Sequence, residues 1–495
     1  MPFIAYPSAY YYPEPKKMQK RQSVEHHPWG YWVTTTSEKT NGFVKVKLRW
    51  KDKQGKEHKF AWLKEEDIQT ERILEINFVD IGQGDGAFIV FPDDKRLIID
   101  AGKGDNMYRF LRWRFNRRKT RIHYTVISHP DEDHYYGLRG LVNDPKFTFD
   151  QVYHNGIVER DGDNPLGART PGRGSELTEL CETQTQLDQV LNNPLLVGEK
   201  RYPSLLKDLR DLNPNSGITM LHHGVGHMPG FSPGEHAKGI VIECLGPAAK
   251  RVNQQLRLPW FSSTGKTKNG HSVVLRLHYG NVRVFLGGDL NIKSEHYLLE
   301  EHTRLDPTPK TLDERNFLID VARQSFECDV MKACHHGSAD VDDIFVESVN
   351  PMATVISSGD KESHCHPRPD ALGIYGKYAR GRRPLIFSTE LARSTEEYVS
   401  MPDHIQEQIT DLVMKISDDS ISASETKRLQ REIEKLIKRK ERAVAVYGMI
   451  TVRTDGDKMI MTQKLEKKRA TTGEKWDIHR FETLDDGQLH YQAKH

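Results

Sequence analysis

Two histidines and two aspartates stand within six consecutive positions of the segment Ser128-His-Pro-Asp-Glu-Asp-His134. They follow the apolar run Tyr124–Ser128, which is typical of a buried strand. Pro130 stops the strand, so the four side chains are expected on a loop at its end, with a helix starting near Asp133. Imidazole nitrogens and carboxylate oxygens bind catalytic divalent metals, and such a loop can serve two ions about 3.5–4 Å apart. A solvated acidic turn is the alternative for this segment by itself.

The pattern of an apolar strand followed by a ligand-type residue recurs along the chain. Val282–Leu286 leads to Asp289, and Cys328–Ala333 leads to His335 and His336. Ala353–Ser357 leads to His364 and His366 in the same way. Residues at the ends of strands are how a sheet scaffold assembles a catalytic site from distant parts of a sequence. The sequence therefore predicts a single site at one edge of a sheet.

A glycine-rich loop, Asp80-Ile-Gly-Gln-Gly-Asp-Gly86, lies between the expected strands Leu74–Val79 and Ala87–Phe91. Its glycines predict a tight turn with positive φ or with close approach to another group. The spacing matches neither the dinucleotide fingerprint nor the P-loop. We interpret it as a turn beside the site, with Asp85 and Asp100 as carboxylates that support the metal ligands without binding the ions.

Composition limits the class of protein. A chain of 495 residues with 36% hydrophobic and 29% charged residues predicts one large catalytic domain with additions, or two to three domains. The 72 basic and 70 acidic residues nearly balance, so polyanion binding would need a local patch. The five scattered cysteines fit reduced thiols, and neither a signal peptide nor a membrane-spanning run is seen, so a cytoplasmic location is expected.

Four regions are expected from the patterning. Residues 1–70 are predicted to be a β-rich extension, since Val44, Val46, Leu48 and Trp50 alternate with basic residues. Residues 71–400 form the core, with the polar stretch 157–268 as an insertion that could roof the site. Residues 401–445 have the spacing of a helical hairpin insertion, which could mediate dimerisation or bind a protein partner. Residues 446–495 are expected to be strands that complete the core.

Seven basic residues alternate with aromatics between Arg109 and Arg121. At helical spacing the aromatics would face the core, and a solvated basic helix face is the commoner outcome for such a pattern. The alternative is a ridge that contacts phosphates near the metal loop.

Six motifs together resemble one family. HxDxDH at His129–His134 resembles the signature of the metallo-β-lactamase superfamily, whose commoner form has histidine at the position of Asp131. More narrowly, the motifs are similar to the soluble hydrolase domain of ComEC-type DNA-uptake proteins and relatives that include a choline-phosphate esterase. They are Asp80–Asp85, Ile99–Gly102, Ser128–His134, Leu286–Asp289, His335–Ser338 and His366–Pro367.

The resemblance implies an α/β (α+β) fold, an αββα sandwich with the metal centre at one edge of its sheets. Carried over by position, His129 and Asp131 would hold a first ion, Asp133, His134 and His336 a second, and Asp289 would bridge them. His154 is our choice for the remaining ligand to the first ion, with His271 as its rival. Asp131 and His366 are the candidate catalytic residues, with His366 on the site wall. Tyr135-Tyr136 departs from the family pattern and would narrow access.

Two divalent ions would lower the pKa of a bridging water and so generate a hydroxide that attacks the substrate. The expected activity is a metal-dependent hydrolase, first of all a phosphodiesterase or nuclease acting on nucleic acid or a nucleotide. Hydrolysis of a lactone, thioester or phosphocholine-type ester is one alternative, and a non-catalytic interaction module with this fold is another. The carboxylate of Asp131 favours manganese relative to zinc. The pattern identifies no substrate-binding residue.

Overall fold

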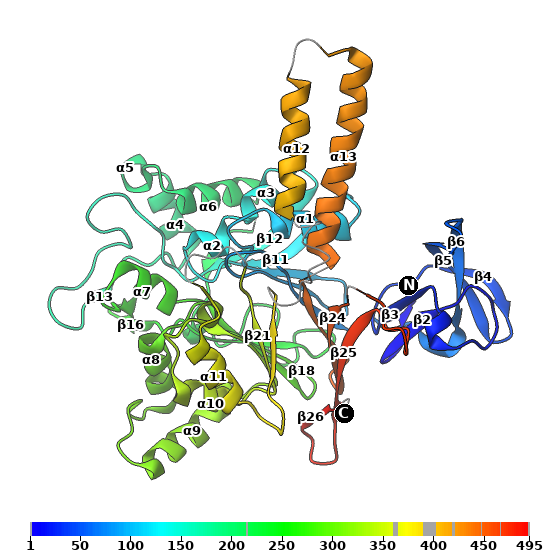
Figure 1. Ribbon diagram of the computed structural model, residues 1–495. Helices are drawn as coiled ribbons and strands as arrows, with labels where there is room; N and C mark the ends of the chain where they lie inside the picture. Colours follow the sequence, from blue (N-terminus) through cyan, green and yellow to red (C-terminus); the bar gives the residue numbers. More distant parts are fainter. Residues whose placement is uncertain are drawn as a thin grey trace.

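The computed structural model describes residues 2–213, 216–359, 365–389, 402–417, 421–446, 448–465 and 467–493. Two sheets dominate the molecule, and Figure 1 shows helices on the outer side of each. No helix in the described part of the chain is long and apolar enough to cross a membrane.

The larger sheet has ten strands in the order β14-β12-β11-β10-β9-β8-β23-β24-β25-β26. The neighbouring strands from β14 to β10 are parallel, and each pair from β10 through β9 to β26 is antiparallel. The strands are β8 (Leu74–Phe78), β9 (Ala87–Val90), β10 (Arg96–Ile99), β11 (Thr120–Val126), β12 (Phe147–His154), β14 (Ile218–Met220), β23 (Ile450–Thr454), β24 (Lys458–Lys464), β25 (Trp476–Thr483) and β26 (Leu489–Gln492).

The second sheet has six strands in the order β15-β18-β19-β20-β21-β22. β15 (Val241–Gly246), β18 (Val274–Tyr279) and β19 (Val282–Leu286) are antiparallel. β20 (Val330–Lys332), β21 (Ala353–Ile356) and β22 (Leu385–Ser388) continue from β19 in parallel. The parallel strands need crossovers, which the helices between them supply.

The two sheets pack face to face through one hydrophobic core. Ile76, Ile89 and Val126 of the first sheet meet Val284 and Val355 of the second in this layer. The outer face of the first sheet is covered by α1 (Asn106–Arg114), α3 (Leu138–Val142), α4 (Gln184–Leu191) and α6 (Arg201–Leu212). The outer face of the second is covered by α8 (Ile292–Thr303), α9 (Leu312–Phe326), α10 (Asp343–Val349) and α11 (Pro369–Lys377). The expected αββα sandwich is confirmed.

The range 157–268, which we expected to be an insertion, contributes to both sheets. β14 is the edge strand beside β12, and β15 is the edge strand beside β18. Long polar loops precede and follow both strands, so the sequence pattern did not reveal their short apolar runs. The rest of the range holds β13 (Glu176–Leu177), α5 (Pro194–Val197), η3 (His223–Val225), β16 (Lys250–Val252), β17 (Gln255–Pro259) and α7 (Thr264–Gly270).

The N-terminal residues form a small β-rich unit with its own core, which includes Ile4, Tyr11 and Val46. It lies beside the C-terminal strands, where Arg453 donates to the carbonyl oxygen of Trp29 at 2.8 Å. Its strands are β1 (Phe3–Ile4), β2 (Ser8–Tyr11), β3 (Glu25–Pro28), β4 (Thr35–Thr40), β5 (Phe43–Lys51), β6 (Glu57–Lys64) and β7 (Ile68–Gln69), with η1 (Lys20–Gln22) and η2 (Glu65–Asp67). The β-rich extension is confirmed.

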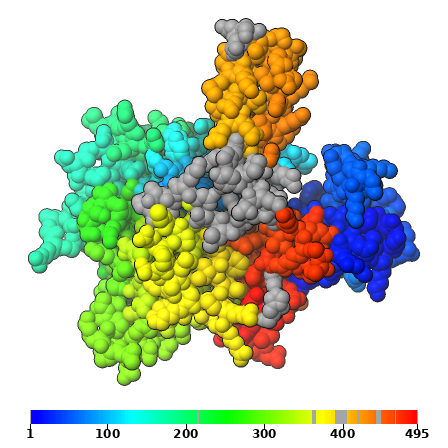
Figure 2. Space-filling model, in the orientation of Figure 1, coloured from blue at the N-terminus to red at the C-terminus, as the bar shows by residue number. Residues whose placement is uncertain are grey.

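The helical hairpin is also confirmed, as α12 (Pro402–Ile416) and α13 (Ala423–Val446). The two helices project from the body of the molecule, as Figure 2 shows. At its base α13 rests on α1, where Glu441 pairs with Arg112 and Arg117 at 3.3 and 3.1 Å.

The basic segment differs from our expectation in one respect. α1 ends at Arg114, and Trp113, which we expected to face the core, is 41% exposed. Phe110 is buried as expected. Five of the seven basic residues pair with carboxylates: Arg109 with Asp105, Arg112 and Arg117 with Glu441, Arg114 with Glu75, and Arg121 with Asp150. The segment therefore mainly anchors α1 and the hairpin.

Candidate metal centre

The predicted ligands come from loops that follow strands of both sheets. β11 of the first sheet leads to His129 and to the short helix α2 (Glu132–Tyr135). In the second sheet, β19 leads to Asp289 and β20 leads to η4 (Cys334–Gly337). The backbones of these loops are joined, since the Val273 amide donates to Ser128 and the His335 amide donates to Gly288. Strand packing thus brings residues 200 positions apart to one place.

Among the described residues, one group has the composition and spacing to hold a metal ion. Asp85, His134, Asp289 and His336 are all buried, and each offers one ligand atom within 4.8 Å of the others. The Nε2 atoms of His134 and His336 both lie 3.2 Å from Oδ2 of Asp289. Two imidazole nitrogens therefore converge on one carboxylate oxygen.

A second carboxylate stands behind each of these histidines. His134 donates from Nδ1 to Oδ2 of Asp100 at 2.8 Å, and Ser128 donates to the same oxygen at 2.6 Å. On the other side, Nδ1 of His336 lies 3.1 Å from Oδ1 of Asp85. Such contacts fix the ring orientation and direct Nε2 toward the centre. We predicted that Asp85 and Asp100 would support the ligands; Asp100 lies outside the compact group, whereas Asp85 is one of its four possible ligands.

The residues present fit a divalent cation. Nε2 of His129, His134 and His336 and Oδ1 of Asp289 are buried without a hydrogen-bond partner. Buried polar atoms are normally satisfied, so an unpaired group of this kind requires an explanation. Imidazole nitrogen with carboxylate oxygen is a donor set that suits zinc or manganese. A bound ion would satisfy these atoms.

The loop that carries His336 is strained. His335 and His336 both have left-handed backbones, with φ of 48° and 55°, and Gly337 follows with φ of 80°. Left-handed backbone costs a residue with a side chain roughly 1–2 kcal/mol, and such strain clusters at functional sites. The conformation turns His336 inward, where its side chain is buried, while His335 stays partly exposed.

The electrostatics of the group follow from burial and from its close charges. Burial lowers the pKa of His129 well below its ordinary value, and the neighbouring His134 adds to this effect. Burial also opposes charge on His134 and His336, but Asp289 and the carboxylate behind each ring raise the pKa of His134 well above its ordinary value and that of His336 to about 10. The same histidines hold the pKa of Asp289 well below its usual range, against the effect of burial. The buried carboxylates therefore carry charge that a cation can balance.

The other residues that the sequence singled out lie around this group. Asp133 Oδ2 is 3.7 Å from Nε2 of His336, and Asp131 Oδ2 is 3.7 Å from Nε2 of His129. The ring of His366 is centred 5.8 Å from that of His335 and 6.3 Å from that of His336. His364, which we also noted, lies outside the described residues.

The two rivals for the remaining ligand, His154 and His271, are each hydrogen-bonded to a backbone carbonyl. His154 Nε2 lies 3.1 Å from the carbonyl oxygen of Cys181 and His271 Nε2 lies 2.7 Å from that of Pro259. Burial lowers the pKa of both imidazoles to about 4, so both are neutral. Each histidine uses one nitrogen to bind a backbone carbonyl.

Two lysines that the sequence analysis did not single out pair with carboxylates of the site: Lys332, which is buried, and Lys268, which is partly buried. Lys332, at the end of β20, pairs with Asp85 and lies 3.8 Å from Oδ1 of Asp289. A lysine inside the apolar run Cys328–Ala333 is a signal that could have been noticed, since unpaired lysines are rarely buried. Lys268, in α7, pairs with Asp131 and nothing in its local sequence indicates this.

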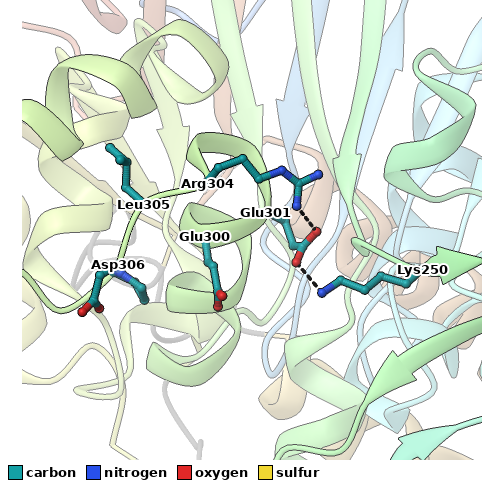
Figure 3. Close-up of a pocket in the computed structure, with 7 residues that line it drawn as sticks. Lys250, Glu300, Glu301, Arg304, Leu305 and Asp306 are labelled. Carbon is teal, nitrogen blue, oxygen red and sulfur yellow. Dashed lines mark hydrogen bonds and ion pairs between the residues drawn. The ribbon is translucent and has the colours of Figure 1, made fainter.

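Two cavities differ in their position relative to the centre. One of about 270 Å³ borders the metal loop and is lined by Pro130, Asp131, Glu132, Tyr135, Glu159, Glu199, Lys200, Arg201 and Lys268. The other, of about 550 Å³, lies at the far end of α8 (Figure 3). There Glu301 forms ion pairs with two basic side chains, Lys250 at 2.7 Å and Arg304 at 2.8 Å. Because α8 begins three residues after Asp289 and its twelve residues span about 18 Å, this second cavity is remote from the centre.

Comparison with known proteins gives one match. Residues 80–243, about one third of the chain, match the Metallo-beta-lactamase superfamily. The match includes the glycine-rich loop and the metal loop and extends to β15. The two-sheet sandwich described above is the fold of that superfamily, and its buried Asp and His group is a possible metal site. No curated protein matches the chain.

Proposed function

We propose that this protein is a metal-dependent hydrolase that cleaves phosphodiester bonds, with a nucleic acid or nucleotide as its substrate. One observation carries the proposal of a metal enzyme. The buried Nε2 atoms of His134 and His336 have no hydrogen-bond partner and meet at Oδ2 of Asp289, 3.2 Å from each. The superfamily match over residues 80–243 supports hydrolysis as the reaction class.

A divalent cation held there would lower the pKa of a water molecule bound to it and would neutralise charge on a phosphoryl oxygen. Residues of the chain orient the side chains that would bind this cation. Asp100 accepts a hydrogen bond from Nδ1 of His134, so a bound cation would replace the proton at Nε2. Asp85 stands in the same position behind His336. Lys332 pairs with Asp85 and so limits the negative charge of the cluster.

The substrate class rests on the six motifs that resemble the hydrolase domain of ComEC-type proteins. His366, beside His335 and His336, is the residue we propose to contact the substrate or the leaving group. The carboxylates of the group favour manganese, with zinc as the alternative. Most of the arginines between Arg109 and Arg121 are paired with carboxylates of the protein. Of this segment, only the exposed Arg118 and Lys119 are therefore proposed to contact phosphates of a substrate.

The test is hydrolysis of bis-p-nitrophenyl phosphate and of single- and double-stranded DNA with added Mn²⁺ or Zn²⁺. His336→Ala should reduce turnover at least about 100-fold, because an essential ligand is lost. His223→Ala is the matched control, since His223 is exposed and its ring packs against His302 outside the group. Its turnover should equal that of the wild type.

Two outcomes would contradict the proposal in different ways. Bound metal without phosphodiester turnover would indicate a lactone, thioester or phosphocholine-type ester as substrate. Absence of bound metal after reconstitution would favour a non-catalytic interaction module.

A further inference from the structure

Both carboxylate oxygens of Asp131 are engaged by residues of α7. The ammonium group of Lys268 pairs with Oδ1. When the amide of Asn269 is oriented with its oxygen toward His335, its nitrogen lies 2.7 Å from Oδ2 and 3.1 Å from the carbonyl oxygen of Gly265. The residue expected to bind a first ion is therefore held by two nitrogen donors from the protein itself.

Lys268 is fixed in this place by further contacts. Its ammonium group lies 3.1 Å from Glu159 and donates to the carbonyl oxygen of Pro130 at 3.4 Å. Its side chain is only 14% exposed. A buried ammonium group needs such partners, and its removal from them would leave an unpaired charge. The ion pair with Asp131 is thus part of the packed structure.

The rivals for the remaining ligand to a first ion are partly engaged within the protein, and of their ring nitrogens only Nδ1 of His154 is buried without a hydrogen-bond partner. His129 Nε2 is free of hydrogen bonds, but His154 and His271 each bind a backbone carbonyl through Nε2. Within the part of the chain that the structure describes, potential ligands form a compact group only at Asp85, His134, Asp289 and His336. His129 and Asp131 are not part of it. A second divalent ion at Asp131 would also lie close to the ammonium charge, which repels it.

We infer that Lys268 takes the place of the first ion, so that the centre binds one divalent cation, at His134, Asp289 and His336. The inference rests on the metal centre of the proposed function and changes its stoichiometry. Lys268 is a positioning residue in this arrangement, because it holds Asp131 and supplies fixed positive charge where relatives with two ions would place a metal.

Metal stoichiometry tests the inference without a substrate. The protein is saturated with Mn²⁺, dialysed and analysed by inductively coupled plasma mass spectrometry, and its electron paramagnetic resonance spectrum is recorded. The wild type should contain about one ion per chain, with the hyperfine pattern of an isolated Mn²⁺. Lys268→Met should contain about two ions with the signal of a coupled pair, because it removes the ammonium charge and frees Oδ1 of Asp131, which lies beside His129.

Two control variants make the result specific. Lys250→Met removes a lysine that pairs with Glu301 in the remote cavity of Figure 3, and its stoichiometry should stay at about one. His336→Ala should lose the ion altogether. If Lys268→Met does not fold, Lys268→Gln takes its place, because it removes the charge but keeps a hydrogen-bond donor toward Asp131, and it should also contain about two ions.

The failures of the two proposals can be told apart. Two coupled ions in the wild type would overturn the role of Lys268 and leave the metal hydrolase intact. One ion in both the wild type and a folded Lys268→Met would also overturn it, because the ammonium group would not be what excludes the second ion. No ion in the wild type would overturn the proposed function itself.

Discussion

Gly84 holds the glycine-rich loop against the metal loop. Its φ is +102°, and a Cβ at this position would lie 1.7 Å from the carbonyl oxygen of Asp133. This close approach allows the amide of Asp85 to donate to the same oxygen at 3.1 Å. The glycine therefore positions Asp85 behind His336, which is a packing requirement and not a phosphate-binding one.

Gly84→Ala should destabilise the protein and reduce its metal content, because the backbone of Asp133 would have to move. Gly82→Ala is the matched control, since Gly82 has φ of +76° but its Cβ would meet nothing within 4 Å. The control should cost only the conformational strain of about 1–2 kcal/mol. Thermal unfolding and metal analysis of both variants provide the measurement, and equal effects would show that the contact with Asp133 is unimportant.

At the scale of the elements, Glu75 connects three of them. It lies on β8 and pairs with Arg114 of α1 at 2.8 Å and with Arg453 of β23 at 3.5 Å. Burial opposes its charge, but the two arginines outweigh this and lower the pKa of Glu75 to about 2. The shift from the ordinary value near 4.5 corresponds to about 3 kcal/mol of stabilisation by the charged form.

Glu75→Gln should therefore lower the free energy of unfolding by about 3 kcal/mol at pH 7. Since the folded pKa is depressed, this stabilisation is present above pH 4.5 and is lost as the pH falls toward 2. The difference between wild type and variant should shrink across that range, which urea unfolding at several pH values measures. Glu38→Gln, which breaks the pair between Glu38 on β4 and Lys45 on β5, is the control and should change the free energy of unfolding by less than about 1 kcal/mol.

The helical hairpin depends on one buried carboxylate at its base. Glu441→Gln removes the charge that Arg112 and Arg117 share, so α13 should separate more readily from α1. Hydrogen exchange should become faster in α12 and α13 and stay unchanged in the two sheets. Glu425→Gln, at the exposed pair with Arg428 near the other end of α13, should leave exchange as in the wild type. A uniform change throughout the molecule would contradict this local role.

At the scale of the whole molecule, the metal centre joins the two sheets. His134 follows a strand of the first sheet, while Asp289 and His336 follow strands of the second. An ion that needs all three ligands binds only to the folded protein, in which the two sheets are packed together. By mass action, Mn²⁺ at 100 times its dissociation constant should stabilise the protein by about 2.7 kcal/mol.

This stabilisation should appear as a rise in the unfolding temperature that a chelator reverses. Asp289→Asn should lose most of the rise, because its carboxylate lies at the point where both histidines converge. A variant that keeps the full rise would show that the ion binds elsewhere.

The sequence by itself determined much of this protein. Apolar runs bounded by glycine, proline and aspartate defined most of the strands, and helical spacing defined α12 and α13, because these signals are local. The sequence also indicated the types of the candidate ligands and their places directly after strands. The αββα sandwich followed from the resemblance carried by six motifs.

Only the tertiary structure decided which side chains meet. Short edge strands such as β14 and β15 are specified by their neighbours in the sheet, so a polar stretch concealed them. His154 and His271 are alternatives for one ligand position in the sequence, and in the fold each lies within hydrogen-bond distance of a backbone carbonyl. Lys268 reaches Asp131 across 137 positions, and Lys332 meets Asp85 across 247. Such pairings depend on how strands from two sheets pack together, and local periodicity carries no information about that packing.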